Sequence, residues 1–102
     1  MKKENWNESN IPDQSGKIFI VTGPTSGLGE ETTRVLSRKN ATVIMAARNI
    51  KKAESVANEI LAENKNAKID IQELNLSSLE SVSNFSQSIN KKYKTLDCLI
   101  NN

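Results

Sequence analysis

The sequence predicts an α/β fold in which helices cover a parallel β-sheet. Three observations predict it. Short runs are apolar at every position, which is typical of strands buried on both faces of a parallel sheet. Between these runs lie longer segments with the apolar spacing of amphipathic helices. The two kinds of segment alternate from residue 17 onward, and such alternation indicates parallel strands joined by helical crossovers.

The first half of the chain contains two of the predicted strands. Residues 18–21 are continuously apolar and end at a glycine-rich turn, residues 22–29. A helix is predicted over residues 30–39, where apolar side chains gather on one side. Residues 42–46 form the second apolar run and are predicted to be the second strand.

The second half repeats this pattern. A helix is predicted from a stripe of apolar residues at Ala53, Val56, Ala57, Ile60 and Leu61. Residues 69–76 suggest a third strand, with Ile69, Ile71, Leu74 and Leu76 as its apolar positions. A third helical stripe consists of Leu79, Val82, Phe85, Ile89 and Tyr93. Residues 96–100 are predicted to be the fourth strand.

Two local details accompany these elements. Ser77 and Glu80 have the spacing of a capping box, in which the serine hydroxyl reaches forward and the glutamate reaches back. Cys98 lies within the fourth apolar run, and free cysteine is commonly buried. We therefore expect Cys98 to be a small buried side chain rather than a reactive thiol.

Right-handed crossovers place the first two helices on one face of the sheet and the third on the other. The expected order of the strands is 3-2-1-4. The fourth strand then lies at an edge. An uncovered apolar edge invites pairing with another chain, so we expect association through this strand and a poorly stable monomer.

The turn at residues 22–29 has the composition of a phosphate-binding loop: Thr-Gly-Pro-Thr-Ser-Gly-Leu-Gly. Glycines let the backbone turn sharply and approach a pyrophosphate closely. The following helix presents free N–H groups and the positive end of its dipole, and Thr25 and Ser26 add hydroxyl donors. A tight structural turn uses the same residues, but the position between a strand and a helix favours a dinucleotide site. The chain has no Gly-Lys-Ser/Thr, which disfavours a nucleoside triphosphate loop.

The loop resembles the Thr-Gly-x-x-x-Gly-x-Gly fingerprint of the short-chain dehydrogenase/reductase family. Residues 11–17 and Ala47-Arg48-Asn49 are similar to its retinol-dehydrogenase-like branch, and the similarity runs from about Trp6 to the last residue. The resemblance implies a Rossmann-like sheet, here one half of a doubly wound fold, that binds NAD(P). The cofactor-binding residues that it implies in the loop are Gly23, Thr25, Ser26, Gly27, Leu28 and Gly29. Pro24 departs from the small residue usual in the family and removes one backbone donor.

The end of the second strand predicts NADP rather than NAD. In NAD-preferring proteins of this architecture an acidic residue there binds the ribose 2′-hydroxyl, whereas an arginine accommodates a 2′-phosphate. Residues 45–51 contain no acid, and Arg48 stands about 20 positions after the loop, where the discriminating residue belongs. A guanidinium can bind the phosphate in a bidentate manner. We therefore place Arg48 at the 2′-phosphate and expect its neighbour Asn49 to be among the cofactor-binding residues. An ordinary surface arginine at a helix start is the alternative reading of Arg48.

Two further pairs complete the expected cofactor site. Asn75 and Leu76 stand where the family has Asp followed by a small apolar residue near the adenine ring, and an amide still offers a carbonyl to the adenine amino group. A polar residue at a strand end is the alternative reading of Asn75. Asn101 and Asn102 match the beginning of the family's Asn-Asn-Ala-Gly element, which lies beside the cofactor.

No catalytic residue is expected in this chain. The family transfers hydride between an alcohol and a carbonyl with a Ser and a Tyr-x-x-x-Lys set. The sequence has one tyrosine, Tyr93, and the residue four positions later is Asp97 rather than lysine. A small alcohol or carbonyl substrate is therefore expected only for a full-length parent.

Composition narrows the class of protein. The 102 residues fit one domain, which we place at residues 16–102 after a polar leader at 1–15. Fourteen basic and twelve acidic residues leave a formal charge of +2, which gives no argument for nucleic acid. No histidine is present, so no metal site is expected, and a single cysteine excludes an internal disulfide and favours the cytoplasm. No apolar run approaches the ~20 residues that span a bilayer.

Three hypotheses about function stay open at this point. The chain is the cofactor-binding part of an NADP-dependent oxidoreductase, a dinucleotide-binding module without turnover, or a scaffold whose loop no longer binds a ligand. Tight cofactor binding by the isolated chain would favour the second, and a well-folded chain indifferent to cofactor would favour the third.

Overall fold

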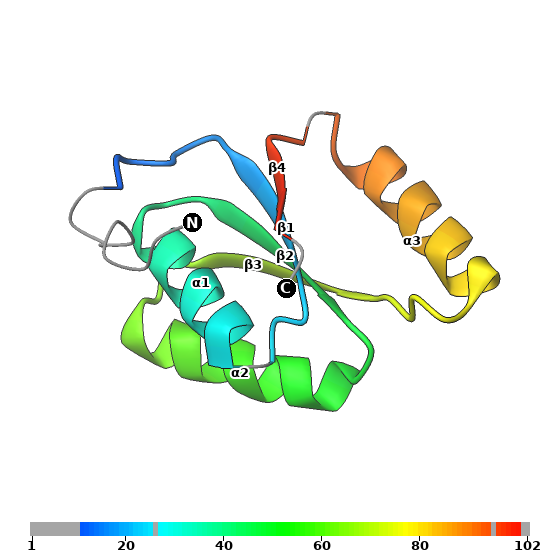
Figure 1. The fold of residues 1–102 in the computed structure, drawn as a ribbon. Coiled ribbons are helices and arrows are strands. Elements are labelled where there is room, and N and C mark those ends of the chain that lie inside the picture. The colour runs from blue at the N-terminus through cyan, green and yellow to red at the C-terminus, as the bar shows by residue number, and fades with distance from the viewer. Residues whose placement is uncertain (1–10, 26, 95, 101–102) are drawn as a thin grey trace.

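The computed structural model describes residues 11–25, 27–94 and 96–100, and within them a four-stranded parallel sheet is flanked by helices (Figure 1). The strands are β1 (Ile18–Thr22), β2 (Thr42–Ala47), β3 (Lys68–Glu73) and β4 (Cys98–Ile100). The helices are α1 (Gly27–Arg38), α2 (Ile50–Glu63) and α3 (Leu79–Lys92). The strand order is β3-β2-β1-β4, which confirms both the predicted fold class and the predicted topology.

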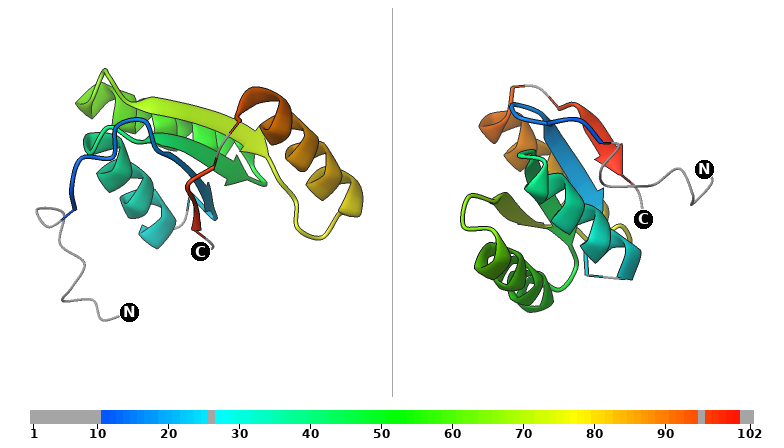
Figure 2. Two further views of the ribbon diagram at one scale, coloured as in Figure 1. Left: turned by 90° about the horizontal axis from the view of Figure 1, so that it is seen from above. Right: turned by 90° about the vertical axis from the view of Figure 1, so that its left-hand side faces the viewer.

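The helices cover opposite faces of the sheet. Figure 2 shows α1 and α2 together on one side and α3 on the other. The side chains of β2 alternate accordingly: Val43 and Met45 belong to the cluster under α1 and α2, whereas Ile44 belongs to the cluster that includes Ile89 of α3. Because neighbouring residues of a strand point to opposite faces, a strand buried on both faces must be apolar throughout.

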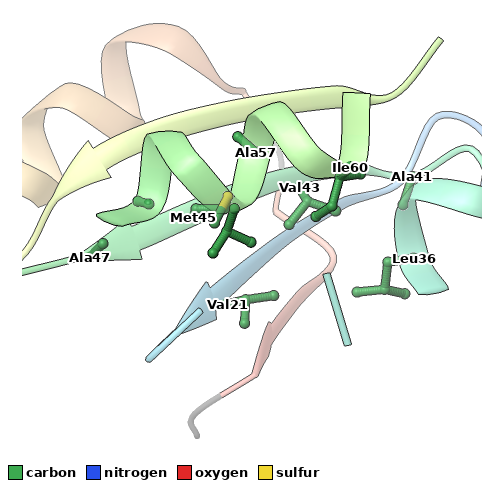
Figure 3. Packing of buried hydrophobic residues seen from close by; sticks show 10 residues of the cluster. Val21, Leu36, Ala41, Val43, Met45, Ala47, Ala57 and Ile60 are labelled. Atoms are coloured by element: carbon green, nitrogen blue, oxygen red, sulfur yellow. The ribbon is translucent and has the colours of Figure 1, made fainter. Parts of the chain in front are cut away.

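The larger apolar cluster lies between the sheet and the helix pair α1–α2. Its members come mainly from β1, β2 and both helices, and Figure 3 shows Ile60 of α2 close to Val43 of β2. Val21, Val43 and Met45 have no exposed surface at all. Close packing of these side chains positions the carboxyl ends of β1 and β2 next to each other.

The outer edge of the sheet at β4 differs from the prediction. The strand begins at Cys98 rather than residue 96, and the thiol of Cys98 is exposed, so the expectation of a buried cysteine is wrong. The reason is topological: β4 pairs with β1 along one side only, and Leu99 is exposed as well. An apolar sequence run therefore does not guarantee burial at a sheet edge.

The start of α3 also differs from the prediction. Ser78, not Ser77, is the N-cap, and its hydroxyl oxygen accepts a hydrogen bond from the backbone N–H of Ser81 at 3.1 Å. The N–H of Ser77 instead donates to the side chain of Asn75 at 3.0 Å. Asparagine side chains commonly bind the backbone two residues on, and this turn shifts the helix start by one residue.

Three leucines predicted in apolar stripes lie at the surface. Leu61 is 36% exposed, Leu76 is 70% exposed and Leu79 is 90% exposed. Leu76 follows the end of β3 at Glu73, and Leu79 is the first residue of α3. Leu76 and Leu79 lie where a strand has ended or a helix begins, and Leu61 lies at the edge of the buried face of α2. The spacing of apolar residues alone therefore wrongly predicted that they are buried.

A hydrogen bond and an ion pair join the C-terminal end of α3 to β3. The hydroxyl of Tyr93 donates to the Asp70 carboxylate at 2.7 Å, and Lys92 Nζ lies 3.1 Å from the same oxygen. Burial alone would raise the pKa of Asp70, but hydrogen bonds from Tyr93, Lys92 and Gln72 outweigh it and hold the pKa below its usual range. Burial, together with the neighbouring Asp70 carboxylate, raises the pKa of Tyr93, so the phenol keeps its proton.

Replacing Tyr93 with phenylalanine is expected to lower the free energy of unfolding by roughly 1–2 kcal/mol at pH 7, because the bond to a charged acceptor is lost. A carboxylate whose folded-state pKa is lowered stabilises the fold above its unfolded pKa, and this stabilisation is lost as the pH falls through the folded-state value. The difference in the free energy of unfolding between the wild type and the variant should therefore be smaller at pH ~3 than at pH 7. Urea unfolding of both proteins at the two pH values measures this difference. An equal loss of unfolding free energy at both pH values would show that the hydroxyl does not stabilise the ionised Asp70.

The residues before β1 are irregular but attached to the domain. Gln14 is buried, and its backbone N–H donates to the Lys39 carbonyl at 2.7 Å, just after α1. Asp13 accepts a hydrogen bond from the side chain of Asn40 at 2.6 Å. Among the described residues, no helix is both long and apolar enough to cross a bilayer.

Candidate functional site: a cavity at the carboxyl ends of β1, β2 and β3

A cavity of about 450 Å³ opens at the edge of the sheet where β1, β2 and β3 end. All three strands are parallel, so their carboxyl ends meet at the same edge. Ligands of open α/β sheets bind at this edge. The lining residues are Thr22, Gly23, Pro24, Thr25, Ala46, Ala47, Arg48, Asn49, Lys52, Leu74, Asn75, Leu76 and Ser77.

The floor of the cavity begins at the end of β1. Gly23 follows the strand with a φ of 62°, a left-handed conformation that glycine adopts without strain. Pro24 is fully buried beside it, so the residue that departs from the family pattern serves here as packing. The turn brings the chain around to α1, which starts at Gly27.

The space in front of α1 is open at Gly27. A Cβ built on Gly27 meets no atom within 4 Å, and Gly27 does not have a left-handed φ. Neither internal packing nor backbone conformation therefore requires glycine at this position. A glycine that the fold itself does not need is what close approach of a ligand to the backbone would demand.

The end of β2 contributes positive charge. Arg48 is exposed at the cavity, and Asn49 caps α2 by accepting a hydrogen bond from the N–H of Lys52 at 3.1 Å. Lys52 also lines the cavity. The lining thus contains two cations and no carboxylate, which suits a ligand with several phosphates.

The residues after β3 form the other side of the cavity. Asn75 lines the cavity, and its side-chain oxygen accepts the hydrogen bond from the N–H of Ser77. Its backbone N–H donates to the hydroxyl of Ser81 at 2.8 Å. The backbone carbonyl of Asn75 accepts a hydrogen bond from the backbone N–H of Ser78 at 3.0 Å. Asn75 is therefore held in one orientation by three hydrogen bonds.

The structure brings most of the predicted site residues together. The predicted residues that line the cavity are Gly23, Thr25, Arg48, Asn49, Asn75 and Leu76. Gly27, Leu28 and Gly29 form the start of α1 but do not line the cavity, and Leu28 is exposed. Ser26, Asn101 and Asn102 lie outside the described residues.

Sequence reasoning missed Lys52 and Ser77, which both line the cavity. For Lys52 a signal existed, because it lies in the first turn of the helix that follows Arg48 and is only four positions away from it. Ser77 was assigned to a cap instead, and no sequence signal placed it at the cavity. The other missed lining residues, such as Ala46 and Leu74, belong to or follow the strands.

Residues 17–102 match the family model described as short chain dehydrogenase. The chain is a member of the short-chain dehydrogenase family. The resemblance stated from the glycine-rich loop is thereby confirmed, and with it membership of an oxidoreductase family that binds NAD(P).

Among characterised relatives, the chain is 40% identical over 87 residues to "Retinol dehydrogenase 12" of Bos taurus, a match that covers 85% of this chain and 28% of the relative. It is 50% identical over 58 residues to the short-chain dehydrogenase/reductase bet4 of Neocamarosporium betae, covering 57% of this chain and 17% of the relative. The chain thus spans less than a third of the length of these relatives.

Solved structures agree with the fold. The menthone neomenthol reductase of Mentha piperita superposes with a TM-score of 0.78 at 29% identity, over 84% of this chain and 31% of that one. A short chain dehydrogenase from Shigella flexneri, solved in complex with NADP, has a TM-score of 0.79 at 30% identity over 88% of this chain and 38% of that one.

The residues present fit a nicotinamide dinucleotide. The open space at Gly27 leaves room for the pyrophosphate, Arg48 and Lys52 supply positive charge, and the cavity lies at the carboxyl edge of the sheet. Within the described part of the chain, no group of His, Cys, Asp or Glu could hold a metal ion.

Proposed function

We propose that this chain binds NADP(H) in the cavity at the carboxyl ends of β1, β2 and β3, as the cofactor-binding part of an alcohol/carbonyl oxidoreductase. The observation that carries the proposal is the lining of that cavity, which joins the glycine-rich loop to Arg48 and Lys52 and contains no carboxylate. Residues 16–102 form the dinucleotide-binding domain in this proposal.

The cavity and the adjoining start of α1 each have a role in binding. The start of α1 offers backbone N–H groups and the positive end of the helix dipole to the pyrophosphate, and Thr25 adds a hydroxyl. Arg48 and Lys52 bind the 2′-phosphate, where a carboxylate would repel it. Leu76 offers an exposed apolar surface to the adenine ring. When bound, the reduced dinucleotide would supply the hydride that the family transfers to a carbonyl, and the oxidised dinucleotide would accept it from an alcohol.

The proposal assigns no chemical step to the residues of this chain. Tyr93 lies at the end of α3, and its hydroxyl is bound to Asp70 rather than directed to the cavity. Asp97, four residues later, accepts a hydrogen bond from the N–H of Ile18 at 2.8 Å. The retinol dehydrogenase relative is more than three times as long, so Ser and Tyr-x-x-x-Lys would come from sequence beyond these 102 residues.

Thermal unfolding with excess NADPH or NADH tests the proposal. A ligand that binds only the native state raises stability by RT ln(1 + [L]/Kd), about 2.7 kcal/mol at 100 times Kd. NADPH should raise the midpoint by roughly 10 °C at that concentration, and NADH by much less. A midpoint that neither nucleotide changes would contradict the proposed function.

Gly27→Ala separates binding from stability. Because a Cβ at residue 27 meets no atom of the chain and alanine favours helices, the variant should be at least as stable as the wild type. Its affinity for NADPH should fall about tenfold or more, since the methyl group occupies the space in front of the backbone. Gly16→Asn is a control for glycine replacement. Residue 16 also has open space around it, but it precedes β1 and so lies at the opposite end of that strand from the glycine-rich loop, and asparagine tolerates its left-handed φ of 81°. Unchanged NADPH affinity in Gly27→Ala would place the nucleotide elsewhere.

A further inference from the structure

We infer that Arg34 is a positioning residue for the nucleotide, because it pairs with Glu30 and keeps that carboxylate away from the start of α1, where the pyrophosphate binds. The inference rests on the proposed function and adds a residue that does not line the nucleotide cavity. It concerns the balance of charge at the first turn of α1, in which Glu30 is the acidic residue.

An acidic residue in the first turn of α1 competes with the proposed ligand. The positive end of a helix dipole attracts a carboxylate of the chain as it attracts a phosphate. Glu30 follows Gly27 by three positions, and residues three apart are neighbours on the surface of a helix. Side chains of a helix also lean toward its N-terminus. Without a partner, the Glu30 carboxylate would therefore extend toward the open space at Gly27, and its charge would repel the pyrophosphate.

Arg34 binds the Glu30 carboxylate from the other direction, four residues further along α1. Nη2 of Arg34 lies 2.7 Å from Oε2 of Glu30. Nη1 of the same guanidinium donates to Oε2 of Glu63, the last residue of α2, at 2.6 Å. The side chain of Arg34 is 15% exposed and that of Glu30 is 32% exposed, so salt screens this pair less than a pair in open solvent.

The two hydrogen bonds of Arg34 act together. The bond to Glu63 anchors the guanidinium to α2, so the guanidinium cannot follow Glu30 toward the glycine-rich loop without breaking that bond. The lining of the nucleotide cavity accordingly contains no carboxylate, although α1 has an acid in its first turn. The start of α1 therefore offers its N–H groups to a pyrophosphate while the charge of Glu30 is balanced by Arg34.

Titration of NADPH and NADH into Arg34→Met tests the inference. Methionine keeps an unbranched apolar stem but leaves Glu30 without its cation. We expect both affinities to fall about fivefold at ~0.05 M salt, because the two nucleotides share the pyrophosphate that Glu30 then repels. At ~1 M salt the loss should be less than about twofold, since charges are screened within about 3 Å. The double variant Arg34→Met/Glu30→Gln should regain the wild-type affinity within about twofold, because the repelling charge is gone.

Glu63→Gln is the matched control. Glutamine still accepts a hydrogen bond from Arg34, and residue 63 lies at the end of α2, outside the cavity, so nucleotide affinity should change less than about twofold. Glu30→Gln alone gives a second measurement that does not depend on the folding of Arg34→Met. Its affinity for NADPH should stay within about twofold of the wild type, because the charge that it removes is already paired.

The outcomes separate the inference from the proposed function. If Arg34→Met binds NADPH as tightly as the wild type, or if Glu30→Gln does not restore the loss, the role of Arg34 is wrong and the proposed function stands. A rise in affinity of about fivefold or more in Glu30→Gln alone would likewise overturn the inference, because Glu30 would then already repel the ligand beside Arg34. A wild-type chain that binds neither nucleotide would overturn the proposed function and the inference with it.

Discussion

Replacing Arg48 with glutamate is expected to weaken NADPH binding about a hundredfold or more while NADH binding is kept or improved. The expectation follows from the lining of the cavity, in which Arg48 and Lys52 are the charged residues. A carboxylate at the end of β2 loses the paired hydrogen bonds of the guanidinium and repels the 2′-phosphate. Losing one partner of a close charge pair costs roughly 2–5 kcal/mol, which corresponds to a factor of about 30 to several thousand in affinity. A 2′-hydroxyl, by contrast, donates readily to the new carboxylate.

Lys51→Glu is the matched control for this charge reversal. Lys51 is exposed on the first turn of α2 but does not line the cavity. Because the side chain of Lys51 is exposed to solvent and outside the cavity, its charge is screened at ~0.15 M salt, so NADPH affinity should fall less than about threefold. The NADPH affinity of Arg48→Lys should lie between those of the wild type and Arg48→Glu, because an ammonium group keeps the positive charge but lacks the planar pair of donors of a guanidinium. Titration with both nucleotides measures the preference; equal loss of NADPH and NADH in Arg48→Glu would contradict a role at the 2′-phosphate.

The fold could be predicted from the sequence because burial on both faces leaves a strong pattern. Residues of β2 such as Ile44 and Met45 are fully buried on opposite sides, so no polar residue interrupts the run. Right-handed crossovers then reduce the possible strand orders to a few, and the resemblance of the glycine-rich loop to the short-chain dehydrogenase/reductase family favours 3-2-1-4 among them. Prediction failed where a residue is apolar without being covered: Cys98 and Leu99 lie on an edge strand, and Leu79 lies at a helix start.

The candidate site was predictable only in part for a related reason. The glycines and Arg48 follow strands at fixed positions, so the topology brings them to one edge of the sheet. The orientation of the Asn75 side chain depends on which backbone group binds it, and that contact arises from a turn rather than a periodic element. Spacing assigned the serine cap one residue too early, and the same error hid the bond between Ser77 and Asn75.

Ile60→Ala is expected to have the largest effect on stability, a loss of roughly 3 kcal/mol in the free energy of unfolding. Ile60 is 1% exposed and belongs to the cluster between α2 and the sheet, where Figure 3 shows it directed toward β2. Removing its side chain leaves a cavity that a sheet and a helix pair can close only in part. A small domain has only about 5–15 kcal/mol of stability in total, so the midpoint of thermal unfolding should fall by more than about 10 °C.

Leu61→Ala is the matched control, because the two residues are neighbours on α2 and both exchanges give alanine, the best helix former. Leu61 is 36% exposed, so its loss should change the free energy of unfolding by less than about 1 kcal/mol. Urea unfolding followed by circular dichroism, with unchanged m-values, measures both variants. Equal destabilisation by the two variants would mean that α2 packs by its apolar stripe as spacing predicts, with Leu61 inside. A large difference would show that α2 packs with Ile60 against the sheet and Leu61 at the surface, as the structure has it.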